Sequence, residues 1–143
     1  MSNPAYNKRR IDKPFYYGPR VVSGEDLGIL SEASRAKVQV ILDAMVWPQL
    51  VSFHYGDSDR LVAPFVIGVS SIGNPLLRGY QVRGVSKSGK GPGWRVFQVV
   101  EMESVENYEE FFDPLDFGFD GFYPWMYKVF RELQGDERSG AVK

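Results

Sequence analysis

The chain has 143 residues, a net charge of −1 and no cysteine, and this length fits a single domain. The lack of cysteine excludes a disulfide scaffold, a thiolate zinc site and a cysteine nucleophile. An apolar share of 43% and an aromatic share of 15% exclude a wholly disordered chain. No apolar run approaches the roughly 20 residues that span a bilayer, and the N-terminus lacks the apolar core of a signal peptide. We therefore expect a cytoplasmic protein without a membrane partner.

The small net charge hides two oppositely charged blocks. Residues 60–100 contain six lysines and arginines and no acid, whereas residues 101–120 contain eight acids and no lysine or arginine. A local basic field attracts phosphate even on a slightly acidic molecule. The alternative is that the two blocks neutralise each other in the folded protein. The six cations are Arg60, Arg78, Arg83, Lys87, Lys90 and Arg95.

Residues 1–22 read as a basic, proline-containing arm that precedes a single domain over residues 23–134. Within the domain, residues 31–47 predict the one clear helix, which Pro48 ends. Its apolar residues recur at helical spacing, namely Val38, Ile41, Leu42 and Met45.

After this helix the apolar period changes to two, which is typical of half-buried strands. Four or five strands are predicted. Four span residues 51–55, 60–69, 76–85 and 94–102, and residues 104–107 either extend the fourth or follow its end. Pro64 within the second strand indicates an edge or a bulge. One helix followed by closely spaced antiparallel strands is typical of a small β-barrel, which would span residues 50–107.

Residues 108–134 predict an acidic-aromatic strap that is held down by its aromatic side chains. Pro114, Gly118 and Gly121 interrupt any helical spacing in its first part. Residues 125–133 are the exception, because their apolar residues share one helical face and predict a short final helix. Residues 135–143 are expected to be a frayed tail.

Few residues suit catalysis or metal binding. His54, the one histidine, lacks the oriented partner that a general base needs, so a solvated or hydrogen-bonded histidine is expected. Asp113, Asp116 and Asp120 do not have the spacing of an EF-hand loop. The glycines of residues 84–93 precede a strand, whereas a Walker loop opens a helix. We expect no enzyme activity, no metal and no cofactor.

Basic and aromatic residues occur together on the two central predicted strands. Arg78 and Tyr80 share one strand face by period two, and Trp94 and Arg95 begin the next strand. Arginine donates parallel hydrogen bonds to phosphate, and an aromatic ring can stack on a base. This pattern favours a platform for a nucleotide or a single-stranded nucleic acid. The alternative is a set of surface arginines that provides solubility.

Four short motifs resemble those of the WYL domain family and follow one another in the family's order. They are Val51-Ser52-Phe53-His54-Tyr55-Gly56, Arg60-Leu61-Val62-Ala63-Pro64, Leu77-Arg78-Gly79-Tyr80 and Gly93-Trp94-Arg95-Val96-Phe97. The resemblance covers about residues 35–107, and residues 111–114 also resemble the end of short stand-alone members. Two features depart from the family pattern. The name-giving triplet reads Leu77-Arg78-Gly79, and residues 98–102 replace a final motif that contains two arginines.

The resemblance implies an SH3-like or Sm-like barrel, preceded by one helix, that binds nucleotides or nucleic acids in bacterial regulation or phage defence. By position, Tyr55 and Phe97 would belong to the core. The alternative function is a protein-interaction module or assembly subunit, in which the arm and the strap dock a second copy or another protein. The residues predicted to bind the ligand are Arg60, Arg78, Tyr80, Arg83, Lys87, Lys90, Trp94 and Arg95.

Overall fold

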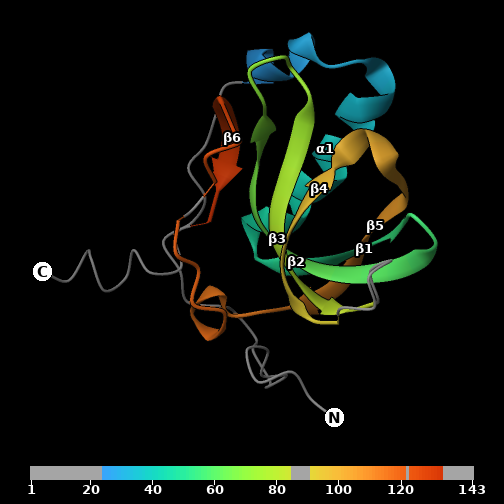
Figure 1. Cartoon of the computed structure of the whole chain (residues 1–143), viewed down its shortest axis with the longest axis vertical. Coiled ribbons are helices and arrows are strands. Elements are labelled where there is room, and N and C mark those ends of the chain that lie inside the picture. The colour runs from blue at the N-terminus through green and yellow to red at the C-terminus, as the bar shows by residue number, and fades with distance from the viewer. Residues whose placement is uncertain (1–23, 85–90, 122, 134–143) are drawn as a thin grey trace, which may run out of the picture.

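The computed structural model describes residues 24–84, 91–121 and 123–133, which form an antiparallel sheet with one α-helix (Figure 1). The helix α1 spans Glu32–Val46, and three 3-10 helices are η1 (Gly24–Ile29), η2 (Val99–Glu101) and η3 (Pro114–Asp116). The strands are β1 (Gln49–Tyr55), β2 (Ser58–Val69), β3 (Pro75–Arg83), β4 (Gly93–Gln98), β5 (Met102–Phe111) and β6 (Lys128–Glu132). The predicted arm, residues 1–22, and the predicted tail, residues 135–143, lie outside the described residues. Among the described helices, none is long and apolar enough to cross a membrane.

The helix α1 begins and ends where the sequence predicts. Ser31 caps its N-terminus, because the Ser31 hydroxyl oxygen accepts a hydrogen bond of 3.1 Å from the backbone N–H of Ser34. At the other end, Trp47 already has an extended backbone, as expected for a residue before proline. The apolar face packs on the sheet and buries Val38, Ile41, Leu42 and Met45.

Strand β2 lies at the centre of the sheet, because three strands pair with it. β3 pairs with it from residue 61 to residue 69, β1 pairs with residues 58–62, and β6 pairs with residues 66–69. The ladder order is β4-β3-β2-β1-β5, with β6 on β2. The predicted β-rich, antiparallel character is confirmed. The sheet is not closed into a barrel, since no ladder within the described residues joins β4 to β5.

The first three predicted strands correspond to β1, β2 and β3, with small shifts at their ends. The β2–β3 register shifts between Pro64 and Val66, which confirms the bulge that the proline indicates. The fourth predicted strand, residues 94–102, is wrong as a single element. The helix η2 interrupts it, and the chain then continues as β5 to Phe111 and pairs with β1. Residues 108–111 therefore belong to the sheet and not to the strap.

The predicted final helix over residues 125–133 is also wrong. Lys128–Glu132 is strand β6, which pairs with the second half of β2. The β1 ladder on β2 stops at Val62, so the same edge of β2 needs another partner for its backbone N–H and C=O groups. β6 supplies this partner. Val129 and Phe130 suit a strand as well as a helix, and the short apolar pattern does not separate the two.

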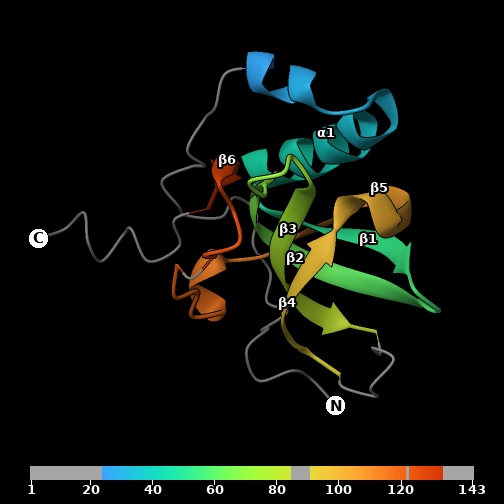
Figure 2. The same cartoon turned by 45° about the horizontal axis from the view of Figure 1, so that its top comes forward.

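Residues 112–121 and 123–126 of the strap lie on a different side of the sheet from α1 (Figure 2). The side chains of Phe112, Phe117 and Phe119 are almost fully buried. Their ring centroids lie 5.7, 5.8 and 5.1 Å from that of Phe65 on β2. The prediction that aromatic side chains hold the strap down is confirmed.

We predict that Gly68→Ala destabilises the protein by separating β6 from β2. A Cβ at Gly68 would overlap the backbone carbonyl oxygen of Lys128 and lie 3.0 Å from the Cα of Val129. Overpacking of this kind costs about 1–3 kcal/mol, which urea unfolding measures. Gly28→Ala is the control, because a Cβ there meets nothing within 4 Å. Equal free energies of unfolding for the two variants would contradict the β2–β6 pairing.

Candidate functional site

Arg78 and two tryptophans form the most distinctive cluster of the described residues. On β3, Arg78 is paired with Val96, and Tyr80 is paired with Trp94 of β4, so these side chains share one face of the sheet. The guanidinium carbon of Arg78 lies 5.1 Å from the ring centroid of Trp94 and 5.4 Å from that of Trp125. Both distances are typical of cation–π contacts. We call Arg78, Trp94 and Trp125 the arginine cage.

Arg78 is largely buried, and within the described residues one of its guanidinium donors, Nε, has no hydrogen-bond partner. The residue is 9% exposed, and its Nε atom is buried with no hydrogen-bond partner in the described part of the chain. This burial lowers the pKa of Arg78, and the negative charge of Asp120 opposes that change. A buried polar group without a partner costs about 1–3 kcal/mol, and more when it is charged. The cage therefore favours an anion that reaches the N–H groups of Arg78.

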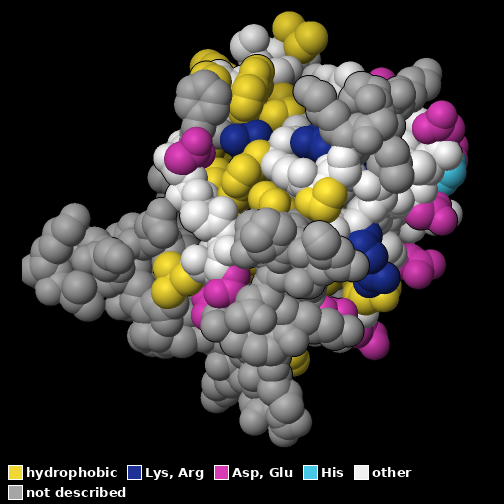
Figure 3. Space-filling view, turned by 60° about the horizontal axis from the view of Figure 1, so that its bottom comes forward, with side chains coloured by type: hydrophobic (Ala, Val, Ile, Leu, Met, Phe, Trp, Pro, Cys, Tyr) yellow, Lys and Arg dark blue, Asp and Glu magenta, His cyan; other side chains and the backbone are white. Residues whose placement is uncertain are grey.

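Aromatic packing fixes one wall of the cage and leaves the other wall exposed. Trp94 contacts Phe65, Tyr80 and Phe119, at centroid distances of 4.9, 5.4 and 5.2 Å. Trp125 is 42% exposed. In the space-filling view of Figure 3, atoms of lysine or arginine reach the surface among hydrophobic side chains. The cage thus combines a cationic group with an aromatic surface that solvent reaches.

Arg60 and Arg95, two of the predicted ligand-binding residues, already have partners within the fold. Arg60 is 6% exposed, and its Nε, Nη1 and Nη2 donate to the Ser58 hydroxyl, the Gln81 side-chain oxygen and the Tyr55 carbonyl at 2.8, 3.0 and 3.1 Å. Arg95 donates to the carbonyl oxygens of Trp94 and Gly91. Arg95 comes directly after Trp94 in β4 and is paired with Gly79 of β3. Its side chain therefore points to the opposite face of the sheet from that of Trp94. The structure does not bring these two arginines into the cage.

The other predicted residues divide between the core, the surface and the undescribed part. Tyr80 is buried against Trp94 and Phe117. Arg83 is exposed and donates a hydrogen bond of 2.9 Å to the Tyr108 hydroxyl, beside a hollow of about 190 Å³. Lys87 and Lys90 lie outside the described residues. Of the eight predicted residues, the cage therefore contains Arg78 and Trp94, with Tyr80 packed beneath them.

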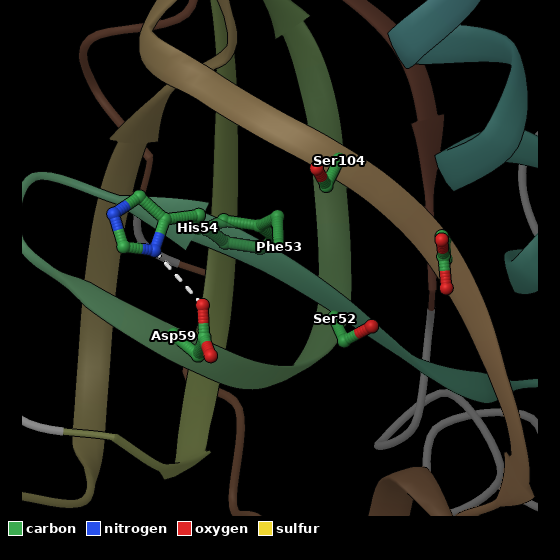
Figure 4. A pocket seen from close by; sticks show the side chains of 6 residues that line it. Ser52, Phe53, His54, Asp59 and Ser104 are labelled. Atoms are coloured by element: carbon green, nitrogen blue, oxygen red, sulfur yellow. Dashed lines mark hydrogen bonds and ion pairs between the residues drawn. The ribbon is translucent and has the colours of Figure 1, made fainter.

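A second hollow of about 240 Å³ is lined by His54 (Figure 4). The Nδ1 of His54 and a carboxylate oxygen of Asp59 are 2.8 Å apart, so the expectation of a hydrogen-bonded histidine is confirmed. The expectation that His54 lacks an oriented partner is wrong, because the pairing of His54 with Asp59 across β1 and β2 supplies one. Ser52 and Ser104 also line the hollow, but the imidazole ring points away from both (Figure 4). The arrangement provides an oriented histidine without a hydroxyl nucleophile beside it.

Comparison of the chain with protein-family models, with curated proteins and with solved structures gives no match. The assignment of the site therefore depends on the geometry alone. Sequence analysis missed Trp125, because it placed this residue at the start of a helix. Only the β2–β6 pairing brings residue 125 near Arg78, and no local pattern in the sequence encodes that contact.

We predict that Arg60 stabilises the fold. Arg60→Ala removes three hydrogen bonds and leaves the buried oxygen of Gln81 without this donor. The expected loss is about 2–4 kcal/mol in the free energy of unfolding, measured with urea. Arg83→Ala is the matched control on an exposed arginine and should change it by about 0.5 kcal/mol or less. A similar small loss for Arg60→Ala would show that the buried network contributes little.

We also predict that Asp59 sets the pKa of His54. The hydrogen bond to Asp59 raises this pKa from its ordinary value of 6.5, desolvation opposes the change, and the charge of Glu103 adds to it. Because the folded pKa is raised, the resulting stabilisation is complete below about pH 6.5 and disappears as the pH rises through the raised pKa. An NMR titration of the His54 ring should show a lower pKa in Asp59→Asn than in the unmodified chain. Asp43→Asn, which changes an acid bonded to Gln39, is the control. An unchanged His54 pKa in Asp59→Asn would contradict this assignment.

Proposed function

We propose that this protein is a binding module for a phosphate-bearing ligand, either a nucleotide or a single-stranded nucleic acid. In this proposal, Arg78 binds the phosphate, and Trp94 and Trp125 position the guanidinium. The observation that carries the proposal is the buried Nε of Arg78 that has no hydrogen-bond partner in the described part of the chain.

The electrostatics of the cage support an anionic ligand. Cation–π contacts use the faces of the guanidinium and leave its N–H donors, which lie in the plane of the group, able to bind an oxyanion. Phosphate suits these donors because two of its oxygens can accept parallel hydrogen bonds. Removal of the guanidinium from water strengthens its attraction to an anion at short range.

The exposure of Trp125 supports a ligand that carries a base as well as a phosphate. Its indole contacts Arg78, yet 42% of the residue remains exposed. Stacking of a base on an exposed aromatic ring contributes about 1–3 kcal/mol per base and tolerates any sequence. A nucleotide unit whose base stacks on Trp125 and whose phosphate meets Arg78 would use both features of the cage.

We further propose that the fold is an open relative of the SH3-like barrel of WYL domains. The four motifs that resemble this family occupy β1, β2, β3 and β4, and each of these strands pairs with the next. Side chains also connect β4 to β1, which are not neighbours in the ladder. The Tyr55 and Phe97 ring centroids are 5.1 Å apart, and the backbone N–H of Gln98 donates to the Tyr55 hydroxyl at 3.0 Å. These contacts support a sheet that curls toward closure.

Two alternatives have weaker support. If the acidic block neutralised the basic block, its carboxylates would bind the arginines. Arg60, Arg83 and Arg95 instead donate to neutral oxygens, whereas the charge of Asp120 does act on Arg78. A protein-interaction module was expected to expose the aromatic residues of the strap. Phe112, Phe117 and Phe119 are instead buried, although Trp125 and Tyr127 remain exposed. The basic cage is therefore the better candidate for function.

We predict that Arg78→Ala weakens the binding of labelled single-stranded DNA or RNA by about tenfold or more, because a charged hydrogen bond contributes about 1.5–3 kcal/mol. Fluorescence anisotropy across a salt series measures this change, and unlabelled nucleotides serve as competitors. Binding that involves phosphate should weaken steeply as salt increases. Successful competition by a mononucleotide would identify a nucleotide site, whereas competition by oligonucleotides alone would identify a strand-binding site.

Arg83→Ala is the matched control, because Arg83 is an exposed arginine on the same strand whose contacts are with Tyr108. It should change the affinity by about twofold or less. Thermal unfolding of Arg78→Ala shows whether the variant keeps its fold. Unchanged affinity in a folded Arg78→Ala protein, or an equal loss in Arg83→Ala, would overturn the proposed site.

A further inference from the structure

The arginine cage contributes a single positive charge, because Arg78 is its one cation. The cation–π contacts of Trp94 and Trp125 are both with this guanidinium. The other arginines of the described strands have hydrogen-bond partners of their own. Arg131 on β6, for example, donates to the carbonyl oxygen of Leu42 in α1, at 2.7 Å. Among the described residues, the cage is thus built on one guanidinium and not on a cluster of cations.

Asp120 lies in the part of the strap that runs past the cage. The preceding residue, Phe119, is buried, and its ring centroid is 5.2 Å from that of Trp94. After Asp120, the chain returns to the cage at Trp125, which contacts Arg78. Asp120 itself is exposed. Burial lowers the pKa of Arg78 and the charge of Asp120 acts in the opposite direction, so this carboxylate is close enough to influence the guanidinium.

A second acid faces the same side of the sheet as Arg78. Val66 of β2 is paired with Arg78 on β3 and with Glu132 on β6, and the side chains of directly paired residues share a face. The Glu132 carboxylate accepts a hydrogen bond of 2.8 Å from the Tyr123 hydroxyl. The Tyr123 ring in turn stacks on Phe119, with the centroids 6.4 Å apart. Glu132 therefore holds the strap, and its charge, like that of Asp120, offsets the charge of Arg78 on this face.

The charges around Arg78 favour a ligand with one negative charge over a ligand with two. A second negative charge is attracted by Arg78 and repelled by Asp120, so it gains little net Coulomb energy. It also makes the ligand harder to remove from water, because the cost of desolvation rises with the square of the charge, about fourfold from one charge to two. The two effects act in the same direction. The cage is therefore expected to discriminate between phosphates by their charge.

We propose that Asp120 is a specificity-determining residue, which makes the arginine cage select a phosphodiester over a phosphomonoester. A phosphodiester carries one negative charge, whereas a terminal phosphate carries about 1.5–2 at pH 7. This inference rests on the phosphate-binding function proposed above and names the class of phosphate that the same site takes. The internucleotide phosphate of a single strand and the ring phosphate of a cyclic nucleotide are both diesters.

The test compares two ligands that differ only in the charge of their phosphate. They are thymidine monophosphate and its methyl ester, which have the same base and sugar. An NMR titration of the isotopically labelled full chain follows the indole N–H resonances of Trp94 and Trp125, at low salt, where screening of Asp120 is weakest. At about pH 7.5, we expect the methyl ester to bind at least about fivefold more tightly than the monophosphate.

Asp120→Asn is the decisive variant, because it removes the charge and keeps the shape of an exposed side chain. The preference for the methyl ester should fall to about twofold or less, mainly through tighter binding of the monophosphate. Asp116→Asn is the matched control, since it removes one carboxylate from another part of the same strap, and it should leave the preference unchanged. An equal effect of both substitutions would assign the preference to the overall charge of the protein and would overturn the role of Asp120.

The pH dependence provides a second test that requires no substitution. A phosphomonoester takes up a proton with a pKa of about 6, so it becomes singly charged as the pH falls from about 7.5 to about 5. Its affinity should then rise about threefold or more toward that of the methyl ester, which has no such proton. The methyl ester, measured at each pH, is the internal control for changes in the charge of His54, Asp120 and Glu132. A constant preference over this pH range would contradict selection by charge.

Two further diesters identify the source of the phosphate. Tighter binding of the dinucleotide of two thymidines than of the cyclic monophosphate of thymidine identifies a strand, and the reverse order identifies a cyclic nucleotide. Equal binding of the monophosphate and its methyl ester, or an unchanged preference in Asp120→Asn, would overturn the inference and leave phosphate binding at Arg78 intact. Failure of every diester to bind up to about 20 mM would overturn it as well. The proposed function has its own test, since it fails if Arg78→Ala leaves the affinity for single-stranded nucleic acid unchanged.

Discussion

The pairing of β2 with three other strands is the constraint on which the rest of the structure depends. β3 occupies one edge of β2, while β1 and β6 divide the other edge between them. From Arg60 to Val69 every residue of β2 is buried, so the strand needs partners on both edges and packing on both faces. Val66 of β2 shows the consequence, because it is paired with Arg78 on β3 and with Glu132 on β6. The chain that leads into β6 must pass close to Arg78, and this passage brings Trp125 onto the guanidinium.

Arg60 and Arg78 are buried to a similar extent but differ in how their guanidinium groups are hydrogen bonded. They are 6% and 9% exposed, so both residues have lost most of their contact with water. Arg60 regains hydrogen bonds from a hydroxyl, a side-chain amide and a backbone carbonyl, and its charge therefore stabilises the turn between β1 and β2. Arg78 has aromatic rings as its neighbours, and its buried Nε has no partner in the part of the chain that the structure describes. A local departure from polar satisfaction of this kind is expected where a fold is adapted to a ligand.

The sequence predicts those elements whose signals are local. Ser31 and Pro48 bound α1 closely, and the alternation from Val51 to Tyr55 finds β1, because a cap, a proline and a period of two each act within a few residues. The helix predicted at the end of the domain is wrong because the structure of that segment depends on residues that are distant in the sequence. Val129 and Phe130 fit either secondary structure, and the open edge of β2 decides between them from about sixty positions away in the chain. The site divides in the same way. The period of two places Arg78 and Tyr80 on one face, whereas the partners of Arg60 and the position of Trp125 depend on contacts between distant strands.

In the proposed function, the aromatic character of the cage lets Arg78 be held in place while its N–H donors stay available to a ligand. A carboxylate partner would hold the guanidinium by accepting from its N–H groups, and it would thereby occupy the donors that a phosphate needs. An aromatic ring attracts the cation through its face and accepts little or nothing from the in-plane donors. Trp94 is fixed by Phe65, Tyr80 and Phe119, so the attraction comes from a rigid surface. Trp125 adds a second ring that is still exposed, and the same indole that steadies Arg78 can therefore also contact a ligand. In the proposed function, the strap contributes Trp125 to the site, and the two aromatic rings leave the N–H donors of Arg78 available to an incoming anion.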